Sequence, residues 1–267
     1  MELSPPRLEL LATPSGSCLE YLERGAGEPT TIFAHGLGGS IGETRPLAAA
    51  VTGRRVFLHF RDHGESRASD GRYDYAALAG DLRAVADRTG ATRAVGVSMG
   101  AGAILRTVAE EPRRFERLVL YLPAAIDRPR TGPALERFDA MAACVERGDV
   151  DGLAAILLTD LPPEVRGSRE AGRYVTSRAA ALVGAAMVGA LRTVPREAPV
   201  TDRAVLRRVD VPVLVVAQAG DEQHAVGVAE ELASALPMAH LHVFDRPGPL
   251  WHSPRALREL VAGFLAG

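Results

Sequence analysis

Short apolar and β-branched runs alternate with amphipathic stretches through the first half of the chain. Residues 30–34, 54–59 and 93–97 read as strands, and residues 117–122 have the near-continuous apolar character of a strand that is buried on both faces. Residues 73–89 have leucine and valine on one face only, which predicts a helix. Strands that alternate with helices are typical of a parallel sheet covered by helices on both faces, so we expect an α/β fold.

The two ends of the chain extend this pattern. Residues 7–13 and 18–24 read as strands, and the turn residues at 14–17 between them predict a hairpin. Near the carboxyl end the alternation resumes. The predicted elements there are strands at 211–217 and 240–244 and helices at 225–236 and 254–265. In the first half of the chain, a short helix is also predicted at 43–51.

Between the two halves, residues 127–200 are rich in alanine and contain several prolines but no strand pattern. We interpret this segment as a helical cap inserted into a core domain made of residues 1–126 and 201–267. The apolar residues of the cap form either its own core or an apolar lining for a substrate, and any single one is expected in the core. They are Met141, Leu153, Ile156, Leu157 and Met187.

Gly96-Val97-Ser98-Met99-Gly100 lies between the strand predicted at 93–97 and a helix predicted at 99–109. The order strand, Gly-x-Ser-x-Gly, helix predicts a nucleophile elbow, a tight turn that exposes a serine hydroxyl at the sheet edge. A Cβ at Gly96 or Gly100 would collide with neighbouring backbone in such a turn. The turn would also aim the Met99 N–H at the position where an oxyanion forms.

A second glycine-rich loop, His35-Gly36-Leu37-Gly38-Gly39-Ser40, follows the strand predicted at 30–34. Its spacing fits neither a dinucleotide-binding loop nor a P-loop, and the chain has no lysine. We interpret it as an oxyanion loop in which the Leu37 N–H is the second donor. His35 is expected to hydrogen-bond within this loop and not to act as a catalyst.

Another polar cluster, Arg61-Asp62-His63-Gly64-Glu65-Ser66, contains residue types that bind metals. These residues are too close in sequence to converge on an ion without a dedicated loop. We therefore expect a charged turn held by its own hydrogen bonds, and no metal or cofactor.

The composition indicates which binding partners and which cellular location to expect. The 267 residues have a net charge of −2, which gives no reason to expect nucleic acid or an anionic membrane as a partner. Two cysteines, Cys18 and Cys144, fit free thiols. Neither a secretory signal nor a membrane span is evident, since the longest apolar stretch, 179–191, is short and broken by glycine. We expect a cytoplasmic monomer or homodimer that acts on a small-molecule substrate.

A serine hydroxyl needs a base, and the base needs a carboxylate to orient it. Both should lie after later strands, because the carboxyl ends of parallel strands meet at one edge. Asp221 follows the strand at 211–217, and His252 follows the strand at 240–244. Two other histidines are rival bases. His242 lies inside a predicted strand, and His224 is only three residues after Asp221, too close in sequence to face it. Glu222 and Asp127 are reserve acids.

With these residues in place, the chain resembles the α/β-hydrolase superfamily over nearly its full length, as a capped enzyme similar to esterases, lactonases and thioesterases. The resemblance rests on His35-Gly36, on the elbow around Ser98, and on the order Ser, Asp, His. It implies a mostly parallel eight-stranded sheet flanked by helices. It also implies roles for individual residues: Ser98 as nucleophile, His252 as base, Asp221 as its orienter, and Leu37 and Met99 as oxyanion donors.

The chain departs from the family at one position. The family usually has Gly-His directly after the last strand, whereas here Gly248 is followed by Pro249 and the histidine comes three residues later. The first hypothesis is a cofactor-independent serine hydrolase acting on an ester, thioester or lactone with an apolar acyl or aromatic group. The alternative is a non-hydrolytic relative (a lyase, cyclase, isomerase or C–C bond-cleaving enzyme) or a binding protein with an impaired triad. Dehalogenases and epoxide hydrolases of this fold use aspartate at the elbow, so Ser98 argues against both.

Overall fold

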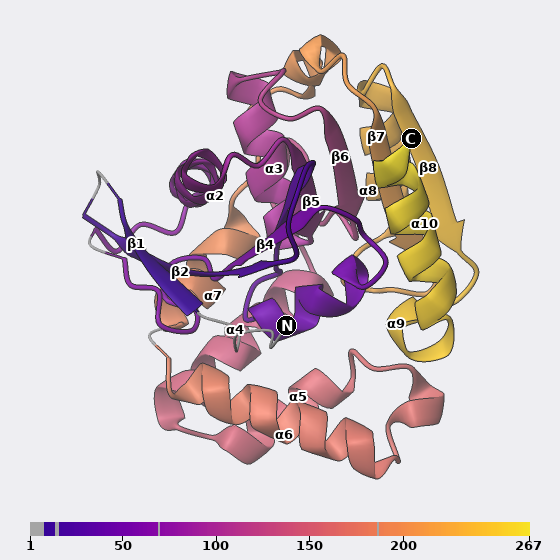
Figure 1. The fold of residues 1–267 in the computed structure, drawn as a ribbon. Helices are drawn as coiled ribbons and strands as arrows, with labels where there is room; N and C mark the ends of the chain where they lie inside the picture. Colours follow the sequence, from indigo (N-terminus) through magenta and orange to yellow (C-terminus); the bar gives the residue numbers. More distant parts are fainter. Residues whose placement is uncertain (1–7, 14–15, 69, 186) are drawn as a thin grey trace, which may run out of the picture.

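The computed structural model describes residues 8–13, 16–68, 70–185 and 187–267. Within these ranges one eight-stranded sheet has the order β1-β2-β4-β3-β5-β6-β7-β8 (Figure 1). β1 and β2 pair antiparallel with each other, β2 pairs antiparallel with β4, and the remaining pairs are parallel. The strands are β1 (Leu8–Ala12), β2 (Cys18–Arg24), β3 (Thr30–Ala34), β4 (Arg54–Leu58), β5 (Arg93–Val97), β6 (Arg117–Tyr121), β7 (Val213–Gln218) and β8 (Ala239–Phe244).

Neighbouring residues within each strand supply two separate cores, one on each face of the sheet. Ile32 of β3 packs into the first core and Phe33 into the second, because successive strand side chains point to opposite faces. The first core also contains residues of α2 (Tyr75–Thr89), α3 (Met99–Glu110) and α8 (Val226–Ala235). The second is covered by α10 (Pro254–Ala266) and the 3-10 turn η1 (Arg45–Ala48).

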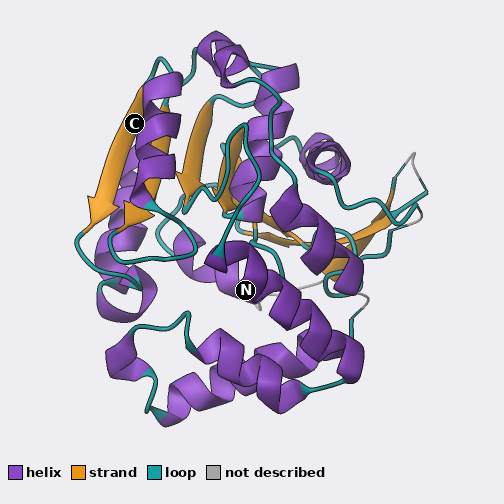
Figure 2. Cartoon of the chain, turned by 180° about the vertical axis from the view of Figure 1, so that it is seen from behind, coloured by secondary structure: helices purple, strands orange, loops and turns teal. Residues whose placement is uncertain are grey.

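The described residues of the segment between β6 and β7 form helices joined by loops, and they contain no strand. Figures 1 and 2 show its helices α5 and α6 beyond the carboxyl ends of the strands, at the edge where the elbow lies. Four of the five apolar residues singled out in this segment are buried, and only Ile156 is partly exposed. Its helices are α4 (Pro133–Arg147), α5 (Val150–Leu158), α6 (Arg169–Val183) and α7 (Val188–Thr193).

The predicted elements agree with the structure except near three prolines. The helix expected at 43–51 is instead the single turn α1 (Ile41–Thr44) followed by η1, with Pro46 in its first turn. The strand expected from 211 starts after Pro212, because proline cannot donate to the sheet. A short helix that was not predicted, α9 (Pro249–His252), precedes α10. In the β1–β2 hairpin the Thr13 hydroxyl donates to the Ser17 carbonyl, while Arg7, Pro14 and Ser15 lie outside the described residues.

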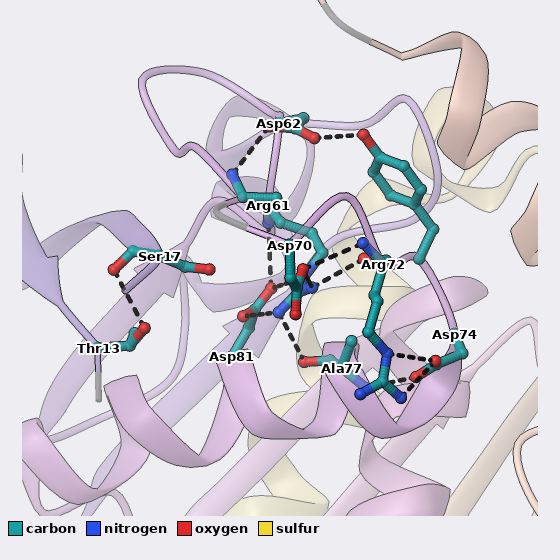
Figure 3. A network of polar contacts seen from close by, with 11 residues as sticks. Thr13, Ser17, Arg61, Asp62, Asp70, Arg72, Asp74, Ala77 and Asp81 are labelled. Carbon is teal, nitrogen blue, oxygen red and sulfur yellow. Dashed lines mark hydrogen bonds and ion pairs between the residues drawn. The ribbon is translucent and has the colours of Figure 1, made fainter. Parts of the chain in front are cut away.

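The charged cluster after β4 forms the hydrogen-bonded turn that the sequence predicts (Figure 3). The Arg61 side chain is only 3% exposed and donates to both carboxylate oxygens of Asp81 at 2.8 Å. It also donates to Asp70, while Tyr73 donates to Asp62 at 2.6 Å. Because a buried cation is stable only when it is paired, the cluster serves to fix the path of the chain between β4 and α2.

Among the described residues, no single helix has both the length and the apolar character needed to cross a membrane. α6 passes that test only jointly with residues 188–196, as a pair bent by 103°.

Candidate active site

Ser98 lies in the strained turn that the sequence predicts between β5 and α3. Its backbone has a φ of 51° and a ψ of −107°, which is an unusual conformation for a residue with a side chain. A Cβ on Gly96 would lie 2.6 Å from the Gly100 carbonyl, and a Cβ on Gly100 would lie 2.3 Å from the Ala34 carbonyl oxygen. Both glycines are therefore required by close backbone packing, and the expectation for them is confirmed.

The Ser98 hydroxyl is hydrogen-bonded to His224. His224 Nε2 lies 2.9 Å from Ser98 Oγ, and His224 Nδ1 lies 3.0 Å from Asp221 Oδ2. The His224 and Asp221 side chains are only 17% and 11% exposed. Hydroxyl, imidazole and carboxylate thus form one continuous chain of hydrogen bonds.

The histidine predicted as the base, His252, is not part of this chain. It ends α9, where its Nε2 lies 3.7 Å from a carboxylate oxygen of Glu164 and has no hydrogen-bond partner among the described residues. Ser98 contacts His224 and not His252, so the predicted base is wrong. The prediction that His224 is too close to Asp221 in sequence to face it is also wrong.

The physical reason is the path of the loop after β7. Asp221 Oδ1 accepts the backbone N–H groups of Gln223 and His224, at 2.8 and 3.0 Å, and so closes a tight turn. This turn brings the His224 ring back onto the second carboxylate oxygen of Asp221. In a helix, a three-residue separation would make the two side chains lie side by side, whereas this loop lets one face the other.

Gln218 joins Asp221 to the loop after β8, and the sequence reasoning missed it. Its Nε2 donates to Asp221 Oδ2 at 2.6 Å, and its Oε1 accepts the Gly248 N–H at 3.0 Å. Burial alone would raise the pKa of Asp221, but the hydrogen bonds from His224, Gln218 and Gln223 and the His224 charge outweigh it and lower the pKa to about 2. The carboxylate is therefore ionised at neutral pH.

Arg130 is a second residue that the sequence reasoning missed. Its Nη2 lies 3.4 Å from Ser98 Oγ, and its Nη1 donates to the Gln223 carbonyl at 2.6 Å. The guanidinium carbon lies 5.2 Å from the centre of the Phe138 ring. Burial lowers the pKa of Arg130, but an arginine with its starting pKa above 12 keeps its charge at neutral pH.

The loop after β3 lies beside Ser98, as a Cβ on Gly36 would be 3.5 Å from Ser98 Cβ. His35 is fully buried, with its Nε2 3.2 Å from the Phe60 N–H and its Nδ1 2.7 Å from the Gly36 carbonyl oxygen. Burial, followed by the neighbouring His63 and His59, holds the pKa of His35 well below its ordinary value. His35 is a neutral hydrogen-bonding residue of the loop, as the sequence predicts.

A cavity of about 810 Å³ opens between this loop and the helical segment. It is lined from the core by Gly36, Val97 and Tyr121, and from the helical segment by Leu182 and Met187. Gly36 lies beside Ser98 and Val97 precedes it in the chain, so the cavity lies next to the elbow, although Ser98 is not among its lining residues.

A sequence model of the alpha/beta hydrolase family matches residues 31–262, most of the chain. The chain belongs to the alpha/beta hydrolase family. Its solved structural neighbours in this family include a hydrolase from Pseudomonas aeruginosa PA01, which is 26% identical with a TM-score of 0.77 over 97% of this chain and 98% of that one.

Two further structures are similar to this hydrolase-family chain at 21% identity and show the same fold. An esterase from Rhodococcus sp. ECU1013 has a TM-score of 0.79 and covers 98% of both chains. The enol-lactonase from Burkholderia xenovorans LB400 has a TM-score of 0.78 over 97% of this chain and all of that one.

A curated relative, the dihydrolipoyllysine-residue acetyltransferase component of the acetoin cleaving system of Cupriavidus necator, is 29% identical over 160 residues. The match covers 52% of this chain and only 42% of that protein. It therefore concerns less than half of the larger polypeptide.

Proposed function

We propose that this alpha/beta-hydrolase is a cofactor-independent serine hydrolase that cleaves an ester, thioester or lactone through an acyl-enzyme. The observation that carries the proposal is the hydrogen-bonded chain from Ser98 through His224 to Asp221. The esterase and enol-lactonase among the neighbours are consistent with this reaction class.

In this mechanism His224 Nε2 accepts the Ser98 proton as Oγ attacks the carbonyl carbon. The same nitrogen then donates that proton to the leaving alcohol or thiol, which departs and leaves the acyl group on Ser98. A water molecule releases the acyl group by the reverse sequence of proton transfers. Asp221, ionised and bonded to Nδ1, keeps the ring oriented and stabilises the imidazolium.

The oxyanion of the tetrahedral intermediate would bind to the Leu37 and Met99 backbone N–H groups. Met99 is the first residue of α3, where backbone N–H groups have no partner within the helix. Leu37 follows Gly36, at which a Cβ would be in van der Waals contact with Ser98 Cβ at 3.5 Å, so the Leu37 N–H belongs to a loop that lies beside the serine. Both donors belong to rigidly packed segments, which is the arrangement that stabilises developing charge most effectively.

We further propose that residues 127–200 act as a cap that selects a small-molecule substrate over a core of residues 1–126 and 201–267. The support is the cavity that the helical segment shares with the core, since both Leu182 and Met187 of that segment and Gly36 and Val97 of the core line it. Its apolar lining residues can contact an apolar group of the substrate, while Glu43, His63 and Arg178 give the same cavity a polar side. The contact between Ser98 and His224 argues against the part of the alternative that required an impaired triad, namely a binding protein.

Labelling with a fluorophosphonate probe tests the nucleophile and the base together. We expect wild-type protein to be labelled, Ser98→Ala to be unlabelled, and His224→Ala to react at least ~100-fold more slowly, the range of general-base effects. His252→Ala is the matched control and should react at the wild-type rate. Thermal unfolding of each variant checks that it is folded.

The opposite pattern, with labelling lost in His252→Ala and kept in His224→Ala, would restore the base expected from the sequence. Folded wild-type protein that resists the probe would contradict the serine-hydrolase proposal itself.

A further inference from the structure

Arg130 is held beside Ser98 by a well-anchored loop between β6 and α4. The Arg130 N–H donates to the Pro195 carbonyl at 3.1 Å, and the Val200 N–H donates to the Ile126 carbonyl at 3.0 Å. The loop also contains Asp127, whose two carboxylate oxygens lie 2.6 and 2.8 Å from the Arg203 guanidinium. The position of the Arg130 side chain is therefore determined by the fold on either side of it.

Arg130 forms no salt bridge with a carboxylate among the described residues, and the Asp221 carboxylate acts on its charge only without direct contact. Its polar contacts are the Gln223 carbonyl and the Ser98 hydroxyl, and its carbon face lies on the Phe138 ring. Arg61, by contrast, is bound by both oxygens of Asp81. A partly buried guanidinium without a directly paired anion is costly, so an anion from outside the chain that bound it would be stabilising.

We propose that Arg130 is a specificity-determining residue that binds a carboxylate of the substrate close to the carbonyl attacked by Ser98. The proposal rests on the proposed serine-hydrolase function. A guanidinium has five N–H groups, and the contacts with Gln223 and Ser98 use only two of them. The two oxygens of a carboxylate can accept two parallel N–H groups of a guanidinium at once.

Distance limits where that carboxylate can be on the substrate. Arg130 Nη2 is 3.4 Å from Ser98 Oγ, and a carbonyl carbon poised for attack lies ~3–3.5 Å from the same oxygen. A carboxylate bound to the guanidinium is therefore only a few bonds from the scissile carbonyl. This geometry fits half-esters or thioesters of short dicarboxylic acids and lactones that carry a carboxylate.

The cavity and Arg130 reach Ser98 from different segments of the chain. The cavity adjoins it through Gly36 and Val97, whereas Arg130 comes from the β6–α4 loop and does not line the cavity. An apolar group and a carboxylate on one substrate would thus have separate places to bind.

A matched pair of esters tests the charge directly. Monomethyl succinate carries the carboxylate, and its amide, methyl succinamate, has nearly the same shape without the charge. We expect wild-type protein to hydrolyse the charged ester with a kcat/KM at least ~10-fold higher, the size of one charge-assisted hydrogen-bonded contact. Arg130→Gln should abolish that preference by lowering kcat/KM for the charged ester about tenfold more than for the uncharged one, and Arg130→Lys should keep part of it.

Arg128→Gln is the control for the loss of one positive charge from the same loop. The Arg128 side chain is 78% exposed, and its ion pair with Asp127 is long, at 3.9 Å. Arg128→Gln should therefore leave kcat/KM unchanged for both esters. Equal losses on both esters in Arg130→Gln would overturn the proposal, because they would show that Arg130 acts by holding the Gln223 carbonyl next to His224. The absence of a preference in wild-type protein would overturn it as well.

If neither methyl ester is hydrolysed, the carboxylate site can be tested by asking whether succinate protects Ser98 from the fluorophosphonate probe. Succinate should slow the labelling of wild-type protein but not of Arg130→Gln, and succinamide should slow neither. Labelling that succinate does not affect would refute the carboxylate site while leaving the serine hydrolase intact. Wild-type protein that is not labelled at all would refute both.

Discussion

At the residue scale, Asp221 holds the His224 end of the proposed triad through four hydrogen bonds. One of its oxygens accepts two backbone N–H groups, and the other faces His224 Nδ1 and Gln218 Nε2. These contacts lower the pKa of the folded carboxyl to about 2, below the ordinary value of 3.8. The unfolded chain therefore binds the proton more readily, and the stability that Asp221 contributes is present above pH 4 and lost as the pH falls through 2.

Asp221→Asn should remove this pH dependence and the catalytic role together. Between pH 5 and pH 2 the free energy of unfolding of wild-type protein should fall by about 2 kcal/mol more than that of the variant, as measured by urea titration. At neutral pH, kcat should fall by about 10⁴-fold, as when the carboxylate of a triad is neutralised.

Glu222→Gln is the matched control, because Glu222 is the adjacent, exposed carboxylate and should tolerate the change. A loss of less than tenfold in Asp221→Asn would make one of the reserve acids the orienting group. Asp127 is the weaker of these, since Arg203 occupies both of its oxygens.

At the scale of elements, buried histidines tie the loop after β3 to the loop after β4. His63 Nε2 accepts the Gly38 N–H at 3.0 Å, and its Nδ1 faces the Arg61 carbonyl at 2.9 Å. Burial is the main cause that lowers the pKa of His63 to about 4. The loop that contains Leu37 is therefore held by an imidazole that must stay neutral.

The pH dependence of stability should show this neutral histidine. The unfolded chain protonates His63 near pH 6.5 and the folded protein only near pH 4, so stability falls as the pH drops between these values. We expect wild-type protein to lose ~3 kcal/mol more than His63→Gln between pH 7 and pH 4 in urea titrations. His242→Gln, which changes an exposed histidine of β8, should behave as wild type; parallel curves for all three proteins would contradict the assignment.

The packing of the elbow against β3 makes a different prediction. Gly100→Ala places a methyl group 2.3 Å from the Ala34 carbonyl oxygen, which is backbone and cannot turn aside. We expect a loss of about 1–3 kcal/mol in stability, measured by thermal or urea unfolding, and a loss of probe labelling as Ser98 shifts.

Gly80→Ala provides the control, because it adds the same methyl group inside α2 with no atom within 4 Å. That change should stabilise the protein by about 0.5–1 kcal/mol, the usual gain in a helix interior. A neutral Gly100→Ala would show that the elbow can relax.

At the scale of the whole molecule, polar contacts tie α6 of the helical segment to the core beside the cavity. Arg178 Nη1 lies 3.3 Å from Glu43, its Nε donates to the Gly38 carbonyl at 3.2 Å, and Tyr174 also donates to Glu43 at 3.2 Å. Arg178 thus joins α6 to the same loop that His63 holds from the other direction.

Arg178→Gln should loosen α6 without unfolding the core. We expect amide hydrogen exchange in Arg169–Val183 to become about five-fold faster, the equivalent of ~1 kcal/mol, with little change in β5 or β6. Arg173→Gln, an exposed change on the same helix, should leave exchange unaltered. Unchanged exchange in Arg178→Gln would mean that apolar packing alone positions α6.

The sequence by itself determined the order of strands and helices, the elbow around Ser98 and the hydrogen-bonding role of His35. Strand and helix periodicity, and the small residues that a tight turn requires, are local properties that remain readable without the fold. The same holds for Asp221, which follows a strand that ends at the edge where Ser98 lies.

Only the tertiary structure decided which histidine meets Ser98, and that Gln218 and Arg130 join the site. Each of these contacts depends on the path of a loop, since the turn at Asp221 folds His224 back while α9 carries His252 toward Glu164. Arg130 is separated from Ser98 by 32 residues and reaches it through backbone anchors in the helical segment. No local pattern encodes such convergence, because it arises from where distant segments pack and not from their own spacing.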